Sequence, residues 1–326
     1  MQTRALGRTG VPVSEIGFGA WGIGKTFWIG ADDAESMRAL DRAIDLGVNF
    51  IDTALGYGRG HSESLVGQVI RERGAEQGVF VATKVPPKNL VWPAQRGVPV
   101  SQCFPPGHVT SCAERSLGNL GLDRIDLLQL HTWQDEYLDQ RETGWAEALL
   151  KLKEQGKVRF LGISINDHDP ASALRAVASG LFDSVQVIYN IFDQSPEEEL
   201  FAACRERGVG VIARVPFDEG ALTGRITAAT TFPAGDFRNE YFRGDRKREV
   251  EERVQKLNAL LGEEAATLPE LALRFCLADE AVSTVIPGMR TVRNVESNAA
   301  VSDGRRLSGA LRERLRGHAW TRNYYK

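Results

Sequence analysis

Four side chains that can hold, move or stabilise a proton stand near the ends of three apolar runs. Asp52, Lys84 and His131 each end such a run, and Tyr57 follows Asp52 five positions later. A buried carboxylate or ammonium is costly unless the two are paired. A nearby ammonium favours tyrosinate and lowers the pKa of a tyrosine. With an imidazole donor, the set could protonate an oxygen on which negative charge develops. The plain alternative is an internal ion pair beside a satisfied histidine and an exposed tyrosine.

These residues depend on a regular alternation of strand-like and helix-like segments. Most of the strand-like segments are continuous apolar runs, which is typical of parallel strands covered on both faces. We predict eight of them, at residues 15–20, 49–54, 79–85, 125–131, 158–164, 184–190, 210–215 and 282–288. Strand and helix alternate without a Pro/Gly/Ser linker, which favours a single (β/α)8 barrel domain over residues 1–326. An open doubly wound sheet is the second interpretation, because counting strands does not prove closure.

Helix signals lie between the predicted strands. Residues 32–46 begin with acidic residues and are followed by Gly47, a usual stop signal. Ser195 and Pro196 have the pattern of an N-cap and first helical residue, in a helix that should end near Gly208. Residues 267–270 read as a capping box. In a barrel, neighbouring strands two, three and four would bring the four polar side chains to one rim.

Three segments exceed what a barrel needs. Residues 1–14 predict a small β-hairpin with a turn at Thr9 and Gly10, which would cap the barrel bottom. Long loops follow the third strand (86–107) and the seventh strand (216–249), and both carry aromatic residues. Because barrel enzymes keep their sites at the carboxyl ends of the strands, we interpret both as substrate-binding loops. The last residues, 318–326, fit either a fold over the site or docking on the barrel wall.

Composition excludes several classes of protein. The chain has 326 residues and a formal net charge of −3, without the sustained basic run of a nucleic-acid surface. No apolar run is long enough to span a membrane, and the first residues lack a signal sequence, so we expect a cytoplasmic protein. Its four cysteines are too scattered for a disulfide framework. Cys103, His108 and Cys112 lie close in sequence, but no C-x-x-C pair supports zinc, and we predict no metal.

Two nucleotide-binding patterns overlap after the first predicted strand. Residues 17–22 match G-x-G-x-x-G, and residues 19–26 (GAWGIGKT) match the phosphate-loop pattern. Both motifs need a helix to begin at once, so that its first N–H groups meet the phosphates. The helical signal starts only near Asp32, and Gly30 would interrupt any earlier helix. We therefore interpret the segment as a glycine-rich loop, and a nucleotide triphosphatase is kept only as a remote alternative.

The sequence resembles the aldo-keto reductase family from the N-terminal hairpin to about residue 301. The matching segments are NFIDTALGYG (49–58), HSESLVG (61–67), VATK (81–84), LLQLH (127–131), VQVIYN (185–190) and IPGMRTVRNVESN (286–298). The resemblance implies a (β/α)8 barrel that reduces a small carbonyl substrate with a nicotinamide cofactor, usually the phosphorylated form. It also implies a catalytic tetrad of Asp52, Tyr57, Lys84 and His131.

The resemblance implies a cofactor site that matches less closely. Ser164 and Gln186 fit the carboxamide contacts, whereas the expected asparagine comes one place late, as Asn166. Arg214 stands where an aromatic residue usually stacks on the nicotinamide; a planar guanidinium can stack on a ring, and a plain salt bridge is the alternative. The cofactor candidates are Gly19, Trp21, Ser164, Asn166, Gln186, Arg214, Phe217, Gly220, Leu222, Gly288, Arg290, Asn294 and Asn298. Among them, residues 217–222 resemble the loop whose backbone N–H groups meet the pyrophosphate of the cofactor.

Cofactor choice and substrate class follow from fewer residues. Arg290 could neutralise a 2′-phosphate, which favours NADPH over NADH. Its alternative is a surface arginine beside helix N-terminal asparagines. Tryptophans on the rim loops suggest stacking on sugars or aromatic compounds, and we predict a substrate pocket of Trp21, Trp28, Trp92 and Trp133. A cofactor-binding regulatory subunit with little turnover is the main rival function, and the intact tetrad argues against it.

Overall fold

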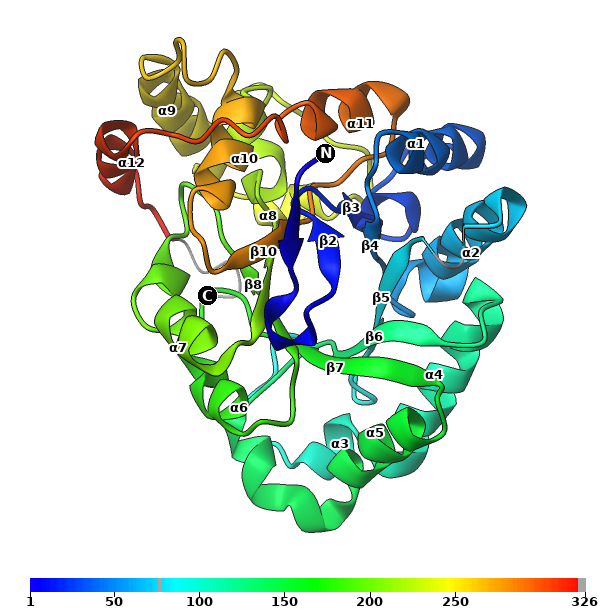
Figure 1. Cartoon of the computed structure of the whole chain (residues 1–326). Helices are drawn as coiled ribbons and strands as arrows, with labels where there is room; N and C mark the ends of the chain where they lie inside the picture. The colour runs from blue at the N-terminus through cyan, green and yellow to red at the C-terminus, as the bar shows by residue number, and fades with distance from the viewer. Residues whose placement is uncertain (76–77, 322–326) are drawn as a thin grey trace.

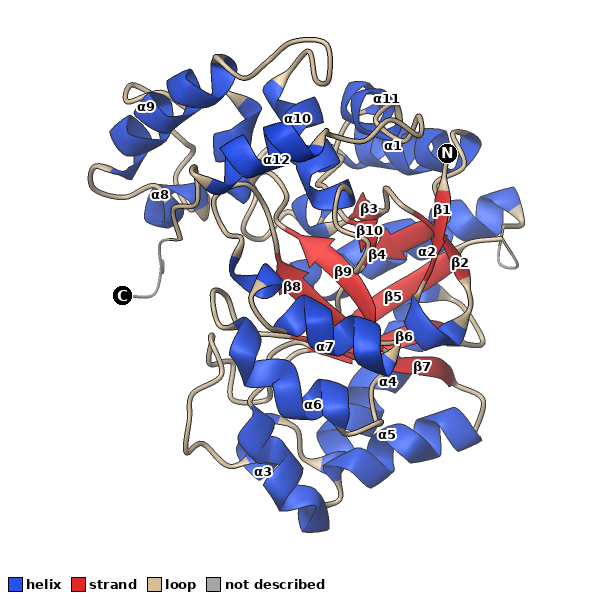
Figure 2. Cartoon of the chain, turned by 60° about the vertical axis from the view of Figure 1, so that its left-hand side comes forward, coloured by secondary structure: helices blue, strands red, loops and turns tan. Residues whose placement is uncertain are grey.

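The eight apolar runs form eight parallel strands, each beside its neighbour in sequence. The protein is described by a computed structural model that covers residues 1–75 and 78–321. Figures 1 and 2 show the strands at the centre and the helices around them. The strands are β3 (Phe18–Gly19), β4 (Phe50–Asp52), β5 (Phe80–Val85), β6 (Ile125–Leu130), β7 (Val158–Ser164), β8 (Ser184–Ile188), β9 (Gly210–Arg214) and β10 (Val282–Val285).

Parallel pairing between the first and last strands closes the barrel. Ile16 pairs with Val285 and Gly19 with Gly288, so the open-sheet interpretation is wrong. The Gly19 N–H donates to the Pro287 carbonyl at 3.0 Å. A Cβ atom at position 19 would lie 2.7 Å from the Ile286 carbonyl oxygen. Closure at this seam therefore requires glycine, and this explains one residue of the apparent nucleotide-binding pattern.

Twelve α-helices and several short 3-10 turns surround the strands in the described residues. The predicted start signals act as caps in two cases, because the side chains of Asp32 and Thr267 accept hydrogen bonds from the N–H groups of Glu35 and Glu270. The helices are α1 (Asp33–Asp45), α2 (His61–Arg73), α3 (Val100–Cys103), α4 (Pro106–Leu120), α5 (Trp145–Glu154), α6 (Leu174–Ala178), α7 (Leu200–Arg207), α8 (Arg238–Tyr241), α9 (Arg246–Asn258), α10 (Leu268–Leu277), α11 (Val292–Ala299) and α12 (Gly309–Arg316).

The predicted N-cap at Ser195 is wrong. Ser195 begins a separate 3-10 turn, Ser195–Glu197, and α7 starts only at Leu200. The Ser195 hydroxyl donates to Asp193 at 2.6 Å, so it is held by the preceding loop rather than by the helix. The predicted end is confirmed, because Gly208 follows α7 in the left-handed conformation.

The N-terminal hairpin of β1 (Thr3–Ala5) and β2 (Pro12–Ser14) crosses one end of the barrel (Figure 1). Leu6 and Val13 are fully buried and join the apolar residues inside the barrel, among them Phe50. Gly7 has φ +49°, and a Cβ there would lie 2.3 Å from the Gly210 nitrogen at the start of β9. The hairpin thus covers the amino-terminal ends of the strands, as predicted, and leaves their carboxyl ends for the site.

The long loops are fastened to each other and to the rim. The Asn166 side chain accepts from the Ala94 N–H at 2.9 Å and donates to the Ala94 carbonyl at 3.1 Å, which fixes the loop after β5. The Phe237 N–H donates to the Phe27 carbonyl at 2.8 Å, which joins the loops after β9 and β3. These backbone contacts decide which loop side chains stand above the strand ends.

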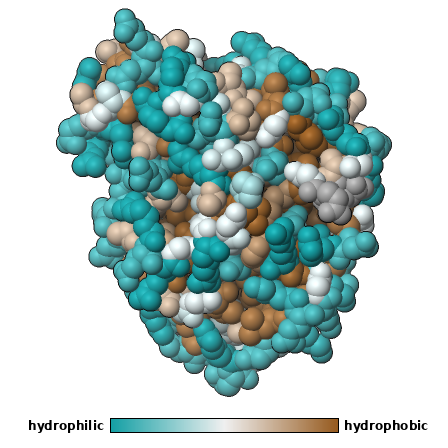
Figure 3. Space-filling model, in the orientation of Figure 1, coloured by the Kyte–Doolittle hydropathy of each residue, from teal (hydrophilic) through white to brown (hydrophobic). Residues whose placement is uncertain are grey.

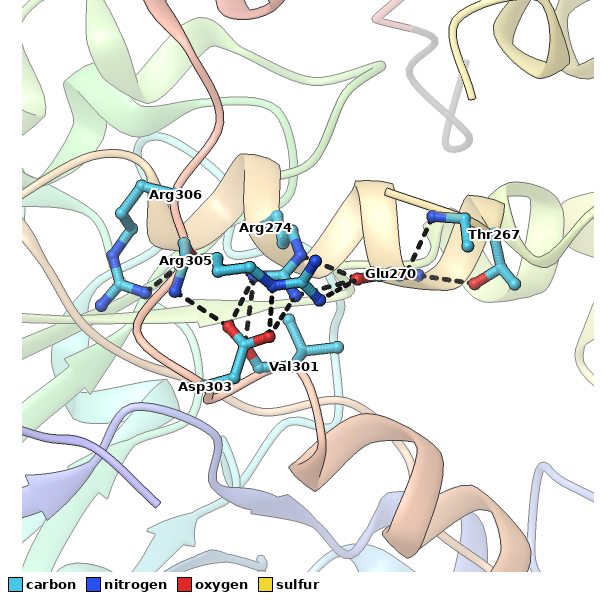
Figure 4. Close-up of polar contacts among 8 residues, drawn as sticks. Thr267, Glu270, Arg274, Val301, Asp303, Arg305 and Arg306 are labelled. Carbon is cyan, nitrogen blue, oxygen red and sulfur yellow. Dashed lines mark hydrogen bonds and ion pairs between the residues drawn. The ribbon is translucent and has the colours of Figure 1, made fainter. Parts of the chain in front are cut away.

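A buried arginine ties the C-terminal segment to α10 (Figure 4). Arg274 is 1% exposed and donates to both Glu270 and Asp303 at 2.8 Å. It also donates to the Arg305 carbonyl at 2.9 Å. Because a buried guanidinium is costly without partners, this cluster holds residues 301–306 against the helix.

The described part of the C-terminal tail packs against the loop that follows β8. The Trp320 N–H donates to the Phe192 carbonyl at 2.7 Å, and the two rings meet edge to face at 5.5 Å. The tail prediction for residues 322–326 lies outside the described residues.

The surface mixes polar and apolar side chains. Figure 3 shows the face that carries the hairpin, with hydrophilic residues around its edge and apolar residues showing between them. Within the described part of the chain, no helix is both long and apolar enough to cross a membrane. The same residues contain no group of three or more His, Cys, Asp or Glu side chains arranged to hold a metal ion.

Asp303→Asn should lower the melting temperature at pH 7. The Arg274 guanidinium holds the pKa of Asp303 below its usual range. Such a carboxyl stabilises the fold above its unfolded pKa of about 3.9 and loses this contribution as the pH falls through its folded pKa. The difference in melting temperature between parent and variant should therefore shrink as the pH falls from about 5 toward 2. Asp245→Asn, at a 79% exposed side chain, is the control. A pH-independent difference would contradict this explanation.

Candidate active site

A buried ion pair stands at the carboxyl ends of β4 and β5. Lys84 is fully buried, and its Nζ donates to Asp52 Oδ1 at 2.5 Å and to the Thr53 carbonyl at 2.8 Å. The third donor direction reaches the Tyr57 hydroxyl at 3.2 Å. The ammonium thus spends its three N–H groups on a carboxylate, a carbonyl and a phenol. The structure brings together three of the four predicted tetrad residues in direct contact.

Two glutamines complete the environment of Asp52. Gln186 Nε2 donates to Asp52 Oδ2 at 2.8 Å, and Gln129 Nε2 donates to the same oxygen at 3.3 Å. Both side chains are at most 1% exposed. One carboxylate oxygen therefore faces Lys84 and the other faces two amides, which leaves Asp52 well supplied with donors. The polar Gln129 inside an otherwise apolar run was a visible sequence signal that we did not use.

Glycines shape the turn that presents Tyr57. The 3-10 segment Tyr57–Gly60 contains Gly58 at φ +65°, and a Cβ there would lie 2.2 Å from the Gly24 carbonyl oxygen. A Cβ at Gly24 would lie 2.9 Å from the Tyr57 carbonyl carbon. The glycine-rich loop after β3 is thus pressed against the tyrosine turn.

The phosphate-loop pattern does not form a phosphate loop. Residues Trp21–Ile23 form a 3-10 turn, and the next helix begins only at Asp33. Lys25 lies at φ +64° and pairs with Asp33 at 2.8 Å.

Burial and charge act in opposite directions on the tyrosine and lysine. Burial raises the pKa of Tyr57 above its ordinary value, and this effect exceeds the lowering by Lys84. The prediction that Lys84 lowers this pKa overall is therefore wrong: the effect of Lys84 has the predicted sign but is smaller than the effect of burial. Burial lowers the pKa of Lys84, but Asp52 and Tyr57 together outweigh it, so this pKa is raised. At neutral pH the site therefore holds a protonated phenol beside an ammonium.

His131 stands beside the tyrosine as a neutral imidazole. Its ring lies 5.6 Å from the Tyr57 ring, centroid to centroid, in an edge-on arrangement. Burial, followed by the charges of Lys84 and Arg214, lowers the pKa of His131 well below its ordinary value. Its Nδ1 is buried without a hydrogen-bond partner in the described part of the molecule. A neutral imidazole here can donate one hydrogen bond from a ring nitrogen.

Aromatic side chains surround the tyrosine and histidine. Trp92 lies edge-on to His131 at 4.7 Å, and Trp21 lies 6.4 Å from Tyr57. Trp28 meets Trp21 at 5.9 Å. The predicted pocket residue Trp133 lies in the packed interior at 0% exposure, with its ring against Tyr137, Trp145 and Phe182. Because Trp133 is fully buried, it is the predicted pocket residue that the structure supports least.

Two of the three predicted carboxamide residues, Gln186 and Asn166, have other partners in this structure. Ser164 ends β7 and is 3% exposed. Gln186 donates to Asp52, and Asn166 spends both ends of its amide on Ala94. The misplaced asparagine thus acts as a loop clamp, which the sequence could not indicate.

Arg214 carries features of both interpretations that the sequence allowed. Its guanidinium pairs with Asp167 and donates to the Ile165 carbonyl at 3.0 Å. It is also close enough to Tyr57 and His131 to affect the pKa of each. The salt bridge therefore forms, and it holds the guanidinium beside the tetrad.

The turn after β9 was predicted to meet a pyrophosphate. The N–H groups of Gly220 and Leu222 both donate to the Phe217 carbonyl, at 2.9 and 3.0 Å. Asp218 and Glu219 have positive φ angles of +46° and +54°. The turn is therefore tightly wound, and these two N–H groups are engaged within it.

The segment after β10 holds the remaining cofactor candidates. A Cβ at Gly288 would meet nothing within 4 Å, so the chain surface is open there. Asn294 lies in the first turn of α11, and Asn298, further along that helix, is 5% exposed.

The surroundings of Arg290 show whether this part of the site suits an anionic cofactor. Its Nη1 donates to the Ile29 carbonyl at 3.4 Å, and its guanidinium lies 5.3 Å from the Trp28 ring centre. Within residues 1–75 and 78–321 it has no carboxylate within salt-bridge distance. Burial, followed by the charge of Arg238, lowers its pKa. A half-buried cation without a counter-ion suits the phosphate groups of a dinucleotide.

Known proteins that are similar to this chain in sequence and fold point to one family. The model of the "Aldo/keto reductase family" matches residues 15–316. Aldo-keto reductase yakc [NADP(+)] of Schizosaccharomyces pombe is 30% identical over 301 residues, covering 91% of this chain and 85% of that protein. The NADH-specific methylglyoxal reductase of Escherichia coli is 30% identical over 315 residues, covering 92% and 93%.

A solved structure agrees with these sequence matches. The holo form of aldo-keto reductase AKR11C1 from Bacillus halodurans superposes with a TM-score of 0.75 at 28% identity, covering 98% of this chain and 96% of that one.

Lys84→Met should destabilise the protein by about 3–5 kcal/mol, because it leaves the buried Asp52 carboxylate without its cation. The double variant Asp52→Asn/Lys84→Met should recover a large part of that loss, since it removes both buried charges. Urea unfolding at pH 7 measures both differences. Equal stability of the Lys84→Met variant and the parent would show that the pair is not desolvated as the structure indicates.

Proposed function

The chain belongs to the aldo/keto reductase family of NAD(P)H-dependent oxidoreductases; from this we propose that it reduces an aldehyde or ketone with NADPH, with Tyr57 as proton donor. The observation that carries the proposal is the convergence of Tyr57, Lys84 and Asp52 in one buried hydrogen-bonded chain with His131 beside it. When bound, the cofactor supplies a hydride to the carbonyl carbon.

Tyr57 and Lys84 neutralise the negative charge that hydride transfer produces on the carbonyl oxygen. The raised pKa of Tyr57 keeps its hydroxyl protonated at neutral pH and ready to donate. As the proton leaves, the ammonium of Lys84 at 3.2 Å stabilises the forming tyrosinate. Asp52 keeps Lys84 charged and fixed, and the glutamines fix Asp52. His131, held neutral, orients the substrate oxygen by a hydrogen bond from its ring.

The substrate side of the proposal rests on the rim aromatics. Trp21, Trp28 and Trp92 present ring surfaces near the tetrad, and Trp92 is 40% exposed. Such walls suit a carbonyl compound with a flat or apolar face, as in a sugar ring or an aromatic aldehyde.

NADPH is proposed because of Arg290. Among relatives, the fission-yeast protein is named for NADP(+) and the Escherichia coli protein for NADH, so the family does not decide the matter. Arg290 lacks a carboxylate partner within the described residues, and a 2′-phosphate would provide the missing anion.

Tyr57→Phe should cut kcat for aldehyde reduction by roughly three orders of magnitude, because it removes the donated proton and leaves the walls of the site. Cofactor affinity, measured by quenching of tryptophan fluorescence with NADPH, should stay within about threefold of the parent. A variant that reduces carbonyls as fast as the parent would exclude Tyr57 as the donor.

A panel of sugar, aromatic and aliphatic carbonyls separates an enzyme from a regulatory subunit. Turnover of at least one class by the parent protein is expected. If the parent protein binds NADPH and turns over none of them, the regulatory interpretation would replace this proposal.

Arg290→Met should weaken NADPH binding at least tenfold while changing NADH binding much less, because the two cofactors differ only in the 2′-phosphate. Arg293→Met, an exposed arginine one turn away on α11, is the matched control and should leave both affinities nearly unchanged. Equal losses for both cofactors would mean that Arg290 does not read the phosphate.

A further inference from the structure

The turn proposed to receive the cofactor's diphosphate carries two acids. Asp218 and Glu219 are consecutive residues of the turn after β9. A carboxylate beside a diphosphate repels it, and the repulsion is stronger where water is excluded. An anion-binding turn with two free carboxylates would work against its own ligand. The surroundings of both acids therefore decide whether the turn can serve this purpose.

Arg246, at the start of α9, holds Asp218. Its side chain is 3% exposed, and Nη2 lies 3.0 Å from Asp218 Oδ2 and 3.3 Å from Oδ1. The Tyr241 hydroxyl donates to Asp218 Oδ1 at 2.5 Å and accepts from Arg246 Nη2 at 3.1 Å. Asp218 itself is 4% exposed. The carboxylate is thus neutralised by a buried cation and fixed by a phenol.

Aromatic rings cover the guanidinium and keep water away from the pair. The guanidinium carbon of Arg246 lies 4.6 Å from the Tyr241 ring centre and 4.9 Å from the Trp320 ring centre. Nε and Nη1 are buried and find no hydrogen-bond partner in the described residues. Within the described residues Asp218 is therefore the only carboxylate paired with this desolvated cation, which makes the pair stronger than a surface ion pair.

The pair also fixes an unusual backbone. Asp218 and Glu219 lie at φ +46° and +54°, and Gly220 follows at +104°. Left-handed residues other than glycine cost free energy and persist where the surrounding structure holds them. The hydrogen bonds of Asp218 to Tyr241 and Arg246 supply that hold. In Figure 2, α8, which carries Tyr241, and α9, which begins at Arg246, lie together at one end of the barrel.

Glu219, the second acid of the turn, loses its negative charge in a different way. Burial, with the neighbouring carboxylates Asp218 and Asp167, raises the pKa of Glu219 to about 8, against the opposing charges of Arg214 and Arg238. Glu219 is then mostly neutral at pH 7. The turn as a whole therefore presents little negative charge as long as Asp218 stays paired.

We propose that Arg246 is a positioning residue for the cofactor, which cancels the charge of Asp218 and holds the turn 218–220 so that it accepts an anionic diphosphate. The inference rests on the proposed function, because it takes the turn as the diphosphate site. Arg246 acts on the cofactor through Asp218 rather than by touching it. Trp320 of the C-terminal segment contributes by covering the pair.

A charge-removal cycle tests the proposal with NADPH affinity as the readout, measured by fluorescence quenching at low and at high salt. Arg246→Met should weaken binding at least tenfold, because it leaves the Asp218 carboxylate without the cation that cancels its charge. The loss should shrink at high salt. Asp218→Asn keeps the hydrogen-bonding groups and should bind as the parent does or tighter. The double variant Asp218→Asn/Arg246→Met should recover most of the lost affinity, since no carboxylate remains to be neutralised.

The double variant separates charge cancellation from a merely structural role. If Arg246 only supported the fold, the double variant would bind as weakly as Arg246→Met, and this result would overturn the proposal. It would also fall if Arg246→Met bound NADPH like the parent. Arg253→Met is the matched control, since Arg253 stacks on Trp320 at 4.1 Å from the same helix and has no hydrogen bond or ion pair to Asp218 within the described chain.

Two further results keep the interpretation clear. Thermal melts without cofactor show whether each variant is folded; should Arg246→Met fail to fold, the double variant, which buries no unpaired charge, carries the test by its affinity relative to Asp218→Asn. A difference of more than about threefold between those two would then contradict charge cancellation. If the parent protein binds no NADPH at all, the proposed function fails instead, whatever the variants do.

Discussion

The ion pair between Lys84 and Asp52 is the constraint around which the carboxyl end of the barrel is organised. Both side chains are at most 2% exposed, and two buried charges are tolerable only with near-complete hydrogen bonding. That requirement accounts for Gln129 and Gln186 on two further strands and for the Thr53 carbonyl. It also decides where Tyr57 must be, because the last N–H of Lys84 faces the phenol.

Backbone and side-chain hydrogen bonds fasten the rim loops. Asn166 holds the loop after β5, and the Phe237 to Phe27 hydrogen bond joins the loops after β9 and β3. Because these clamps hold the loops that carry Trp92 and Trp21, they shape the side of the site on which we propose that the substrate binds. They also explain why a residue matched to a cofactor contact by its type can serve a different purpose.

Four arginines lie near the proposed cofactor site, and they differ in whether a carboxylate pairs with them. Arg214 is tied to Asp167, and Arg238 is tied to Asp236 at 2.8 Å. Arg246 is tied to Asp218, while Arg290 lacks such a partner among residues 1–75 and 78–321. A protein of net charge −3 thus holds three arginines paired with carboxylates and, among the described residues, Arg290 without one. The local pairing of charges, rather than the total charge of the protein, determines where an anion can bind.

The sequence by itself determined the eight strands, the capping hairpin and the meeting of Asp52, Lys84, Tyr57 and His131. Apolar periodicity and the order of parallel strands dictate these features locally. Only the tertiary structure decided that the barrel closes at Gly19, that burial outweighs Lys84 in raising the pKa of Tyr57, and that Asn166 and Arg246 act on loops. Those outcomes depend on desolvation and on contacts between residues far apart in the sequence, such as Asn166 and Ala94, which are 72 positions apart. Neither quantity is encoded in spacing along the chain, because both arise only when distant segments exclude water together.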